Sequence, residues 1–125
     1  MSVPAELKYT AEHEWIRVEG DEIVVGVTEF AQGELGDVVF IEIETEGETL
    51  SIGDTFGTIE AVKTVSDLYM PVDGEVVKVN SALEDTPELV NSEPFEGGWM
   101  IRIKMDDPSQ LDALMSADEY SALIA

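Results

Sequence analysis

Short apolar runs bounded by Gly, Asp and other turn residues recur along the chain, and residues 99–105 alternate apolar and polar positions. Both patterns are typical of β-strands. The stretch from Trp15 to Val27 predicts a hairpin whose turn lies near Gly20-Asp21. Further strands are predicted over residues 38–43, 49–54, 75–79 and 99–105, the second of them ending in Gly53-Asp54. We therefore expect a mainly β protein.

Short helices are predicted from capping residues. Thr28 is a suitable N-cap for a helix that Gly36 ends, and residues 91–98 are expected to form a loop. Single helical turns are predicted at Asn80 and at Thr86-Pro87. Near the C-terminus, Asp107 before Pro108 and the capping box Ser116–Glu119 predict two short helices, with an apolar stripe formed by Leu111, Leu114 and Met115.

The chain contains a weak internal repeat. Residues 36–42 and 74–80 share a glycine, an acid, two valines, a variable position, an apolar residue and a polar residue, in that order. Two matched strands are what a sandwich with a pseudo-twofold axis would need, although a repeat this short can also arise by chance.

Composition limits the chemistry that the chain can perform. With 125 residues, positions 1–125 are expected to form a single domain. Cysteine is absent, so disulfides, a thiol nucleophile and a thiolate metal site are excluded, and any sulfur chemistry must come from an attached group.

The net charge is −22, from 28 acidic and six basic residues. Nucleic acid and anionic membranes attract positive charge, so neither is expected as a partner, whereas enzymes with basic rims around their active sites are favoured. No signal peptide is expected from the first residues, and no apolar run approaches the roughly 20 residues of a membrane span. We expect a soluble protein, either in a bacterial or archaeal cytoplasm or as a mature mitochondrial form.

Few residues are candidates for catalysis. His13 is the only histidine, so it cannot form a triad or a histidine metal cluster, and a structural role beside Trp15 is expected. Neither a calcium loop nor a phosphate-binding loop is present. The alternating acids Glu42, Glu44, Glu46 and Glu48 are interpreted as a solvated surface. No catalytic activity of its own is expected.

Lys63, one of four lysines, lies in a run of small and β-branched residues within positions 57–74. Such a segment suits a lysine that is modified after translation, because the long stem presents an amine that can be acylated. Val62-Lys63 is not a typical hairpin turn, since those favour Asn-Gly or Asp-Gly. Local pattern therefore also allows one continuous strand with Lys63 on a solvated face.

The segment Glu60–Thr64, followed by Ser66-Asp67 and 71–76, resembles the lipoyl-lysine segment of the glycine cleavage system H protein family. The resemblance extends over nearly the whole chain, in the family's order, through His13–Trp15, Gly26–Thr28, Ala31-Gln32, 35–39, Val79-Asn80, 87–92 and Gly98–Met100. In that family the lysine lies at a hairpin tip and carries lipoic acid through an amide, which by position implies Lys63. Biotin carriers typically have Met on both sides of the lysine, and lipoyl domains of 2-oxo acid dehydrogenases typically have Asp before it, whereas here the flanks are Val62 and Thr64.

The resemblance implies a lipoyl/biotinyl-type hybrid β-sandwich (barrel-sandwich hybrid) with short helices, two of them C-terminal. It implies a non-catalytic carrier that moves the aminomethyl group of glycine on a lipoyl arm at Lys63. The implied partners are the pyridoxal-phosphate glycine decarboxylase (P protein), the tetrahydrofolate-dependent aminomethyltransferase (T protein), dihydrolipoamide dehydrogenase (L protein) and a lipoate-attaching enzyme. The isolated chain is expected to be a monomer.

In the family, the loaded arm folds back into a surface cleft lined by acids at the positions of Glu14 and Asp67. At the position of Glu12, relatives can have a small polar residue, so the contacts within the cleft can differ here. Two alternatives stay open: a related protein that relays lipoyl groups to other enzymes, and an unmodified acidic interaction module.

Overall fold

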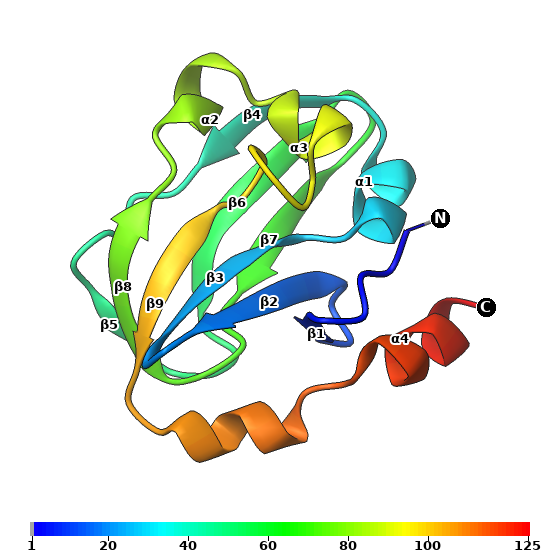
Figure 1. Ribbon diagram of the computed structural model, residues 1–125. Coiled ribbons are helices and arrows are strands. Elements are labelled where there is room, and N and C mark those ends of the chain that lie inside the picture. The colour runs from blue at the N-terminus through cyan, green and yellow to red at the C-terminus, as the bar shows by residue number, and fades with distance from the viewer. Residues whose placement is uncertain (1) are drawn as a thin grey trace.

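The structure, a computed structural model, describes residues 2–125, and its strands form two antiparallel sheets of six and three strands (Figure 1). The larger sheet has the order β1-β2-β3-β9-β8-β5 and the smaller one β4-β6-β7. The strands are β1 Lys8–Tyr9, β2 Glu14–Glu19, β3 Glu22–Val27, β4 Val38–Glu42, β5 Thr49–Leu50, β6 Thr55–Ala61, β7 Val65–Tyr69, β8 Gly74–Val79 and β9 Ile101–Met105. The prediction of a mainly β fold with short helices is confirmed.

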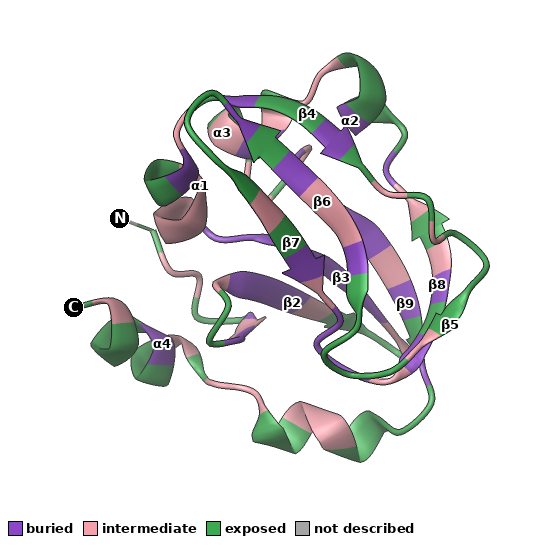
Figure 2. Ribbon diagram, turned by 180° about the vertical axis from the view of Figure 1, so that it is seen from behind, coloured by how far each residue is buried: buried purple, intermediate pink, exposed green. Residues whose placement is uncertain are grey.

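The main core lies between the two sheets (Figure 2). Alternate residues of β3, such as Ile23 and Val25, pack there with Phe56 and Ile59 of β6. A second cluster covers the other face of the larger sheet and contains Leu7, Tyr9, Trp15, Val24 and Tyr120. Because β3 is buried on both faces, its sequence is a continuous apolar run instead of an alternating one.

The helices begin largely where the caps predict. Helix α1 spans Glu29–Leu35, and the side chain of Thr28 accepts a hydrogen bond from the backbone N–H of Ala31 at 3.2 Å. Gly36 ends this helix with a φ of 78°, a conformation that favours glycine. Helix α2 spans Ala82–Asp85, and Asn80 Oδ1 accepts from the N–H of Ala82. Helix α3 spans Leu89–Ser92, so the predicted loop over 91–98 begins only after it.

The C-terminal helices differ in kind. The first, η1 Pro108–Ala113, is a 3₁₀ helix capped by Asp107, and the second, α4 Ala117–Ile124, begins with the predicted capping box. The predicted helical stripe includes Leu111 but not Leu114 or Met115, because η1 ends at Ala113 and Leu114 is extended. The backbone of Met115 exchanges two hydrogen bonds of 2.9 Å with that of Tyr9. This bridge to β1 requires an extended chain and thus separates the two helices.

Two other predicted strands are longer than the strands in the structure. The strand predicted over 49–54 ends at Leu50, because the N–H of Ser51 donates to the side chain of Asp54 at 2.8 Å and Gly53 takes a φ of 88°. These contacts form a turn before β6. The strand predicted over 99–105 starts two residues late, at Ile101.

The internal repeat corresponds to β4 and β8, which lie in different sheets. Each strand has a register shift, between Val38 and Phe40 in β4 and between Val76 and Lys78 in β8. These are the same two positions of the repeated pattern. The shared irregularity supports the pseudo-twofold relation over a chance similarity.

Candidate functional site

Lys63 lies at the tip of a β-hairpin. Strands β6 and β7 pair antiparallel up to Glu60 and Val65, and the N–H of Ala61 donates to the carbonyl of Thr64 at 2.8 Å. The three residues between the strands, Val62, Lys63 and Thr64, are all exposed, and Val62 is 75% exposed (Figure 2). The alternative of one continuous strand is therefore wrong, and the lysine amine is presented to solvent at a turn.

The turn forms without a typical turn sequence because another segment supports it. The N–H of Val62 donates to the carbonyl of Asp37 at 3.0 Å, just after α1. A methyl group on Gly36 would be 3.3 Å from Cε of Lys63, so the lysine stem lies over this glycine. The tip thus rests on residues that are distant in the sequence, and local turn rules could not have located it.

Glu14 is a buried acid, with 3% of its surface exposed. Its Oε2 accepts a hydrogen bond from the N–H of Tyr69 at 3.0 Å, and its Oε1 accepts from Oγ1 of Thr10 at 3.4 Å. Burial raises the pKa of Glu14 from 4.5 to about 8, against the opposing effect of the Tyr69 hydrogen bond, and the charge of Glu12 raises it further. Glu14 thus differs from the solvated acids that make up most of the chain's charge.

A turn at His13 precedes Glu14 and places its side chain in the interior. His13 has a φ of 67°, its N–H donates to the carbonyl of Thr10, and its carbonyl accepts from the N–H of Thr28. Its ring packs on Phe30, and its Nδ1 lies 2.9 Å from the hydroxyl of Tyr120. Burial lowers the pKa of His13. His13 therefore has the structural role expected of it, but through Phe30 and Tyr120 instead of the expected Trp15.

Asp67 is exposed on β7, opposite Thr58 of β6. It lines a surface hollow of about 450 Å³ together with Glu12, Val65, Ser66 and Tyr69. A neighbouring hollow of about 330 Å³ contains Glu14 and the apolar side chains of Leu114 and Met115. Glu12 and Tyr69 line both hollows, so the two hollows adjoin, and we call the pair the cleft. The structure thus places Glu14 and Asp67 in adjoining hollows that share Glu12 and Tyr69.

The distance from the tip to this cleft is short. Asp67 is four residues beyond Lys63, and four residues of extended strand cover about 13 Å. Glu12 lines both hollows. Its charge acts on the neighbouring carboxyl of Glu14, whose pKa it raises.

Sequence reasoning missed three contributors to this site. Thr10 and Tyr69 hold the Glu14 carboxyl, and Tyr69 does so through its backbone, which leaves no signal in the sequence. Asn91 supports the loop beneath the lysine tip through its side chain. It lies in a motif shared with the family, but the motif alone does not indicate this role.

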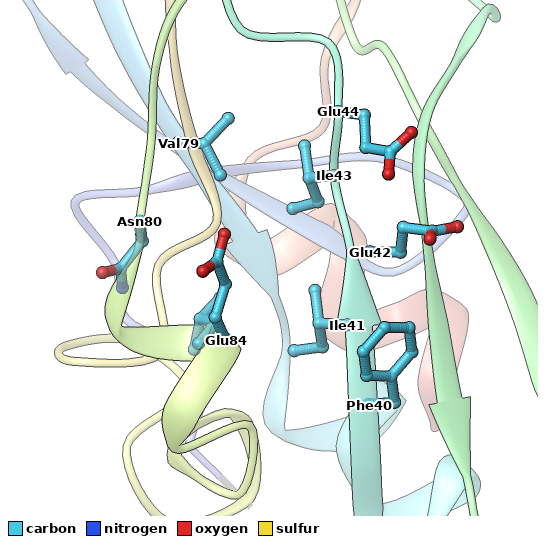
Figure 3. Close-up of a pocket in the computed structure, with 9 residues that line it drawn as sticks. Phe40, Ile41, Glu42, Ile43, Glu44, Val79, Asn80 and Glu84 are labelled. Atoms are coloured by element: carbon cyan, nitrogen blue, oxygen red, sulfur yellow. The ribbon is translucent and has the colours of Figure 1, made fainter.

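Another hollow, of about 240 Å³, lies between β4 and α2 and is lined by Phe40, Ile41, Asn80 and Glu84 among others (Figure 3). None of the three predicted site residues lines it. Within residues 2–125, three or more metal-ligating side chains do not gather anywhere. Over the same residues, no helix is both long and apolar enough to cross a membrane.

Comparisons with known proteins agree with this geometry. A family model described as glycine cleavage H-protein matches residues 7–125. The glycine cleavage system H proteins of Staphylococcus haemolyticus and Staphylococcus carnosus are 55% and 54% identical over 124 residues, which is 99% of this chain and 98% of each relative. The crystal structure of a glycine cleavage system H protein from Mycobacterium marinum superposes with a TM-score of 0.87 at 37% identity, covering 96% of this chain and 97% of the other.

Proposed function

The chain belongs to the glycine cleavage H-protein family, whose members carry lipoyl groups, and we propose that Lys63 is the residue that carries the group here. As a member of this family, the protein is a carrier component of the glycine cleavage system. The observation that supports Lys63 most directly is its exposed position at the tip of the β6–β7 hairpin. An attaching enzyme has to enclose the amine, and a tip with exposed neighbours gives it access.

The other lysines offer poorer sites for attachment. Lys78 and Lys104 are exposed but lie within β8 and β9, and Lys8 is half-buried in β1. A lysine in the middle of a strand projects from the face of a sheet, which an attaching enzyme can enclose less easily than a hairpin tip. We therefore propose that Lys63 is the only lysine that is modified.

When attached, the lipoyl group would supply the sulfur chemistry that a chain without cysteine lacks, and would carry the aminomethyl group of glycine on sulfur. We propose that the cleft along β7 shelters this load. Asp67 lies at the end of the cleft nearest the tip and can accept a hydrogen bond from an amine. The apolar side chains of Leu114 and Met115 would limit the access of water further along.

Glu14 would face the load with a carboxyl of unusual proton affinity. Because the pKa of Glu14 is about 8, the group is largely neutral near pH 7 while the cleft is empty. A cationic amine placed beside it would lower that pKa and favour the carboxylate. The resulting pair would be sheltered from water, where a charge-assisted hydrogen bond is stronger than at the surface.

The acidic surface fits a carrier that visits several enzymes. We propose that the P, T and L proteins and a lipoate-attaching enzyme dock around the hairpin tip, and that the chain has no catalytic activity of its own. The 28 acidic residues would speed encounters with basic rims around the active sites of these enzymes. A cytoplasmic location and a monomeric state stay predictions.

Intact-mass spectrometry after incubation with a lipoate-attaching enzyme, lipoate and ATP tests the attachment site. The wild type should gain one lipoyl group, and Lys63→Arg should gain none while its fold is unchanged. Lys78→Arg and Lys104→Arg are matched controls, because they also change an exposed lysine, and both should be modified like the wild type. A lipoyl group on the Lys63→Arg protein would refute the assignment.

The cleft is tested by formaldehyde released from the aminomethyl-loaded protein without tetrahydrofolate. A charge-assisted hydrogen bond changes a docked population by about tenfold or more, so Glu14→Gln should speed release about tenfold. Asp67→Asn should have a smaller effect, because solvent screens an exposed acid. Glu75→Gln changes an exposed acid on β8 and serves as the control. Equal formaldehyde release from all four proteins would show that Glu14 and Asp67 do not shelter the load. The assignment of Lys63 as the attachment site would not change.

A further inference from the structure

The side chain of Asn91, in α3, bonds to the loop that follows α1. Its Oδ1 accepts a hydrogen bond from the N–H of Val38 at 2.8 Å. Its Nδ2 donates to the carbonyl of Gly36 at 2.8 Å and to Oε1 of Gln32 at 3.0 Å. The amide thus uses its acceptor and both of its donor hydrogens on α1 and the loop after it. Asn91 therefore joins α3 firmly to this loop.

Asp37 lies between Gly36 and Val38, two of the residues that Asn91 bonds, and it supports the lysine tip. Its carbonyl accepts the hydrogen bond from the N–H of Val62, the residue before Lys63. With Gly36 and Val38 both held, the Asp37 carbonyl has little freedom to turn away. The stem of Lys63 in turn lies over Gly36. In Figures 1 and 2, α1 and α3 lie beside the end of the β6–β7 hairpin.

We infer that Asn91 is a positioning residue, which holds the loop 36–38 in the conformation that presents Lys63 for modification. The inference deepens the proposed function and rests on it, since it concerns access to the same lysine. Asn91 does not have to touch the amine, because its effect passes through two hydrogen-bonded backbone segments. Without it, the Asp37 carbonyl and the Val62 N–H should separate more often, and the tip should spend less time in the presented conformation.

Asn80 provides a matched control. Its side chain also joins a helical turn to a loop through three hydrogen bonds, from its Nδ2 to the carbonyls of Gly97 and Trp99 and from the N–H of Ala82 to its Oδ1. These contacts support α2 and the segment before β9, and none of them involves the loop 36–38. Asn80→Ala should therefore cost stability as Asn91→Ala does, without loosening the lysine tip.

The first measurement is amide hydrogen exchange of Val62 by NMR in the unmodified protein. The Val62 N–H should exchange about fivefold faster in Asn91→Ala than in the wild type, which is the change expected when about one hydrogen bond is lost. In Asn80→Ala its exchange should match the wild type. Equal exchange of Val62 in both variants would overturn the inference.

The second measurement is the kinetics of lipoate attachment at increasing protein concentration. If the presented conformation is less populated, KM for the protein should rise about fivefold in Asn91→Ala while kcat stays nearly constant. Asn91→Asp keeps the acceptor for the Val38 N–H and carries the test if Asn91→Ala fails to fold. A KM in the Asn91 variants equal to that of Asn80→Ala would contradict the inference. If the wild type is not modified at Lys63, the proposed function fails. The amide hydrogen exchange of Val62 still tests the role of Asn91 in that case.

Discussion

Replacing Glu14 with glutamine should stabilise the fold in alkaline solution and have little effect in acid. Glu14 is buried, and its pKa is raised from 4.5 to about 8. Between these two values the folded protein binds a proton that the unfolded chain has released. The free energy of unfolding of the wild type must therefore fall as the pH rises through this interval. Below pH 4.5 Glu14 is neutral in both states, and above pH 8 its contribution no longer changes.

The magnitude follows from the two pKa values. Each pH unit between them corresponds to about 1.4 kcal/mol, so an interval from 4.5 to about 8 corresponds to at most about 5 kcal/mol. Water entry and side-chain rearrangement reduce the cost of a buried charge. Between pH 5 and pH 9, the free energy of unfolding of Glu14→Gln should rise by about 2–4 kcal/mol relative to that of the wild type.

Glutamine suits the site because it keeps both hydrogen bonds. Its oxygen can accept from the N–H of Tyr69, and its amide can donate to Oγ1 of Thr10, as a protonated carboxyl would. The substitution therefore removes the titration while the side chain keeps both of its hydrogen-bond partners. Faster formaldehyde loss from Glu14→Gln could then not be ascribed to partial unfolding.

The assay is urea unfolding followed by tryptophan fluorescence at pH 5, 7 and 9, since Trp15 is fully buried in the folded protein. Asp67→Asn removes one negative charge from an exposed position of the same cleft, so it measures the effect of net charge alone. The difference between Glu14→Gln and the wild type should grow with pH and exceed that for Asp67→Asn. A difference that stays constant from pH 5 to pH 9 would refute the buried, proton-binding state of Glu14.

Two further predictions concern the surface and the core. The isolated protein should show no turnover with glycine. Its shuttle rate at subsaturating concentration should fall as the Debye length drops from about 10 Å at 0.1 M salt to about 3 Å at 1 M. A shuttle rate that does not change over this range would exclude steering by the acidic surface. Gly26→Ala should lower the free energy of unfolding by about 1–3 kcal/mol, because a methyl group there would lie 2.7 Å from the Trp15 ring, whose Nε1 is bonded to the Pro94 carbonyl. Gly33→Ala, in α1 with open space around it, should instead be neutral or stabilising, and equal urea midpoints for the two variants would contradict the packing argument.

Much of the fold could be predicted because its signals are local. The turn at Gly20-Asp21, the N-cap Thr28 and the capping box Ser116–Glu119 each depend on residues within a few positions, and the structure has all three. Errors arose where a distant strand competes with a local preference. Met115 has a helical neighbourhood but forms a bridge with Tyr9 of β1, so the chain there is extended.

The lysine turn shows the same limit at the functional site. Val62-Lys63-Thr64 lacks turn-forming residues, and the bond that supports it comes from Asp37, 25 positions earlier in the chain. Only the resemblance to a family indicated the hairpin tip. The residue-level reason for the tip, which includes Asn91, required the packing of α1 and α3 against the hairpin.

The acidic residues differ in burial and therefore in pKa, and a sequence with 28 acidic residues does not reveal which of them are buried. Glu14 and Asp67 both match a family pattern, yet one is buried and the other is exposed. Glu14 differs because β2 packs near the end of β7, where the Tyr69 N–H provides a partner and the protein excludes water. A motif therefore identifies which acids line the cleft, whereas tertiary packing decides which of them can bind a proton near neutral pH. The proton affinity of Glu14 follows from the fold and changes with it, so a substitution that opens the contact between β2 and β7 should lower its pKa toward 4.5 without altering the motif.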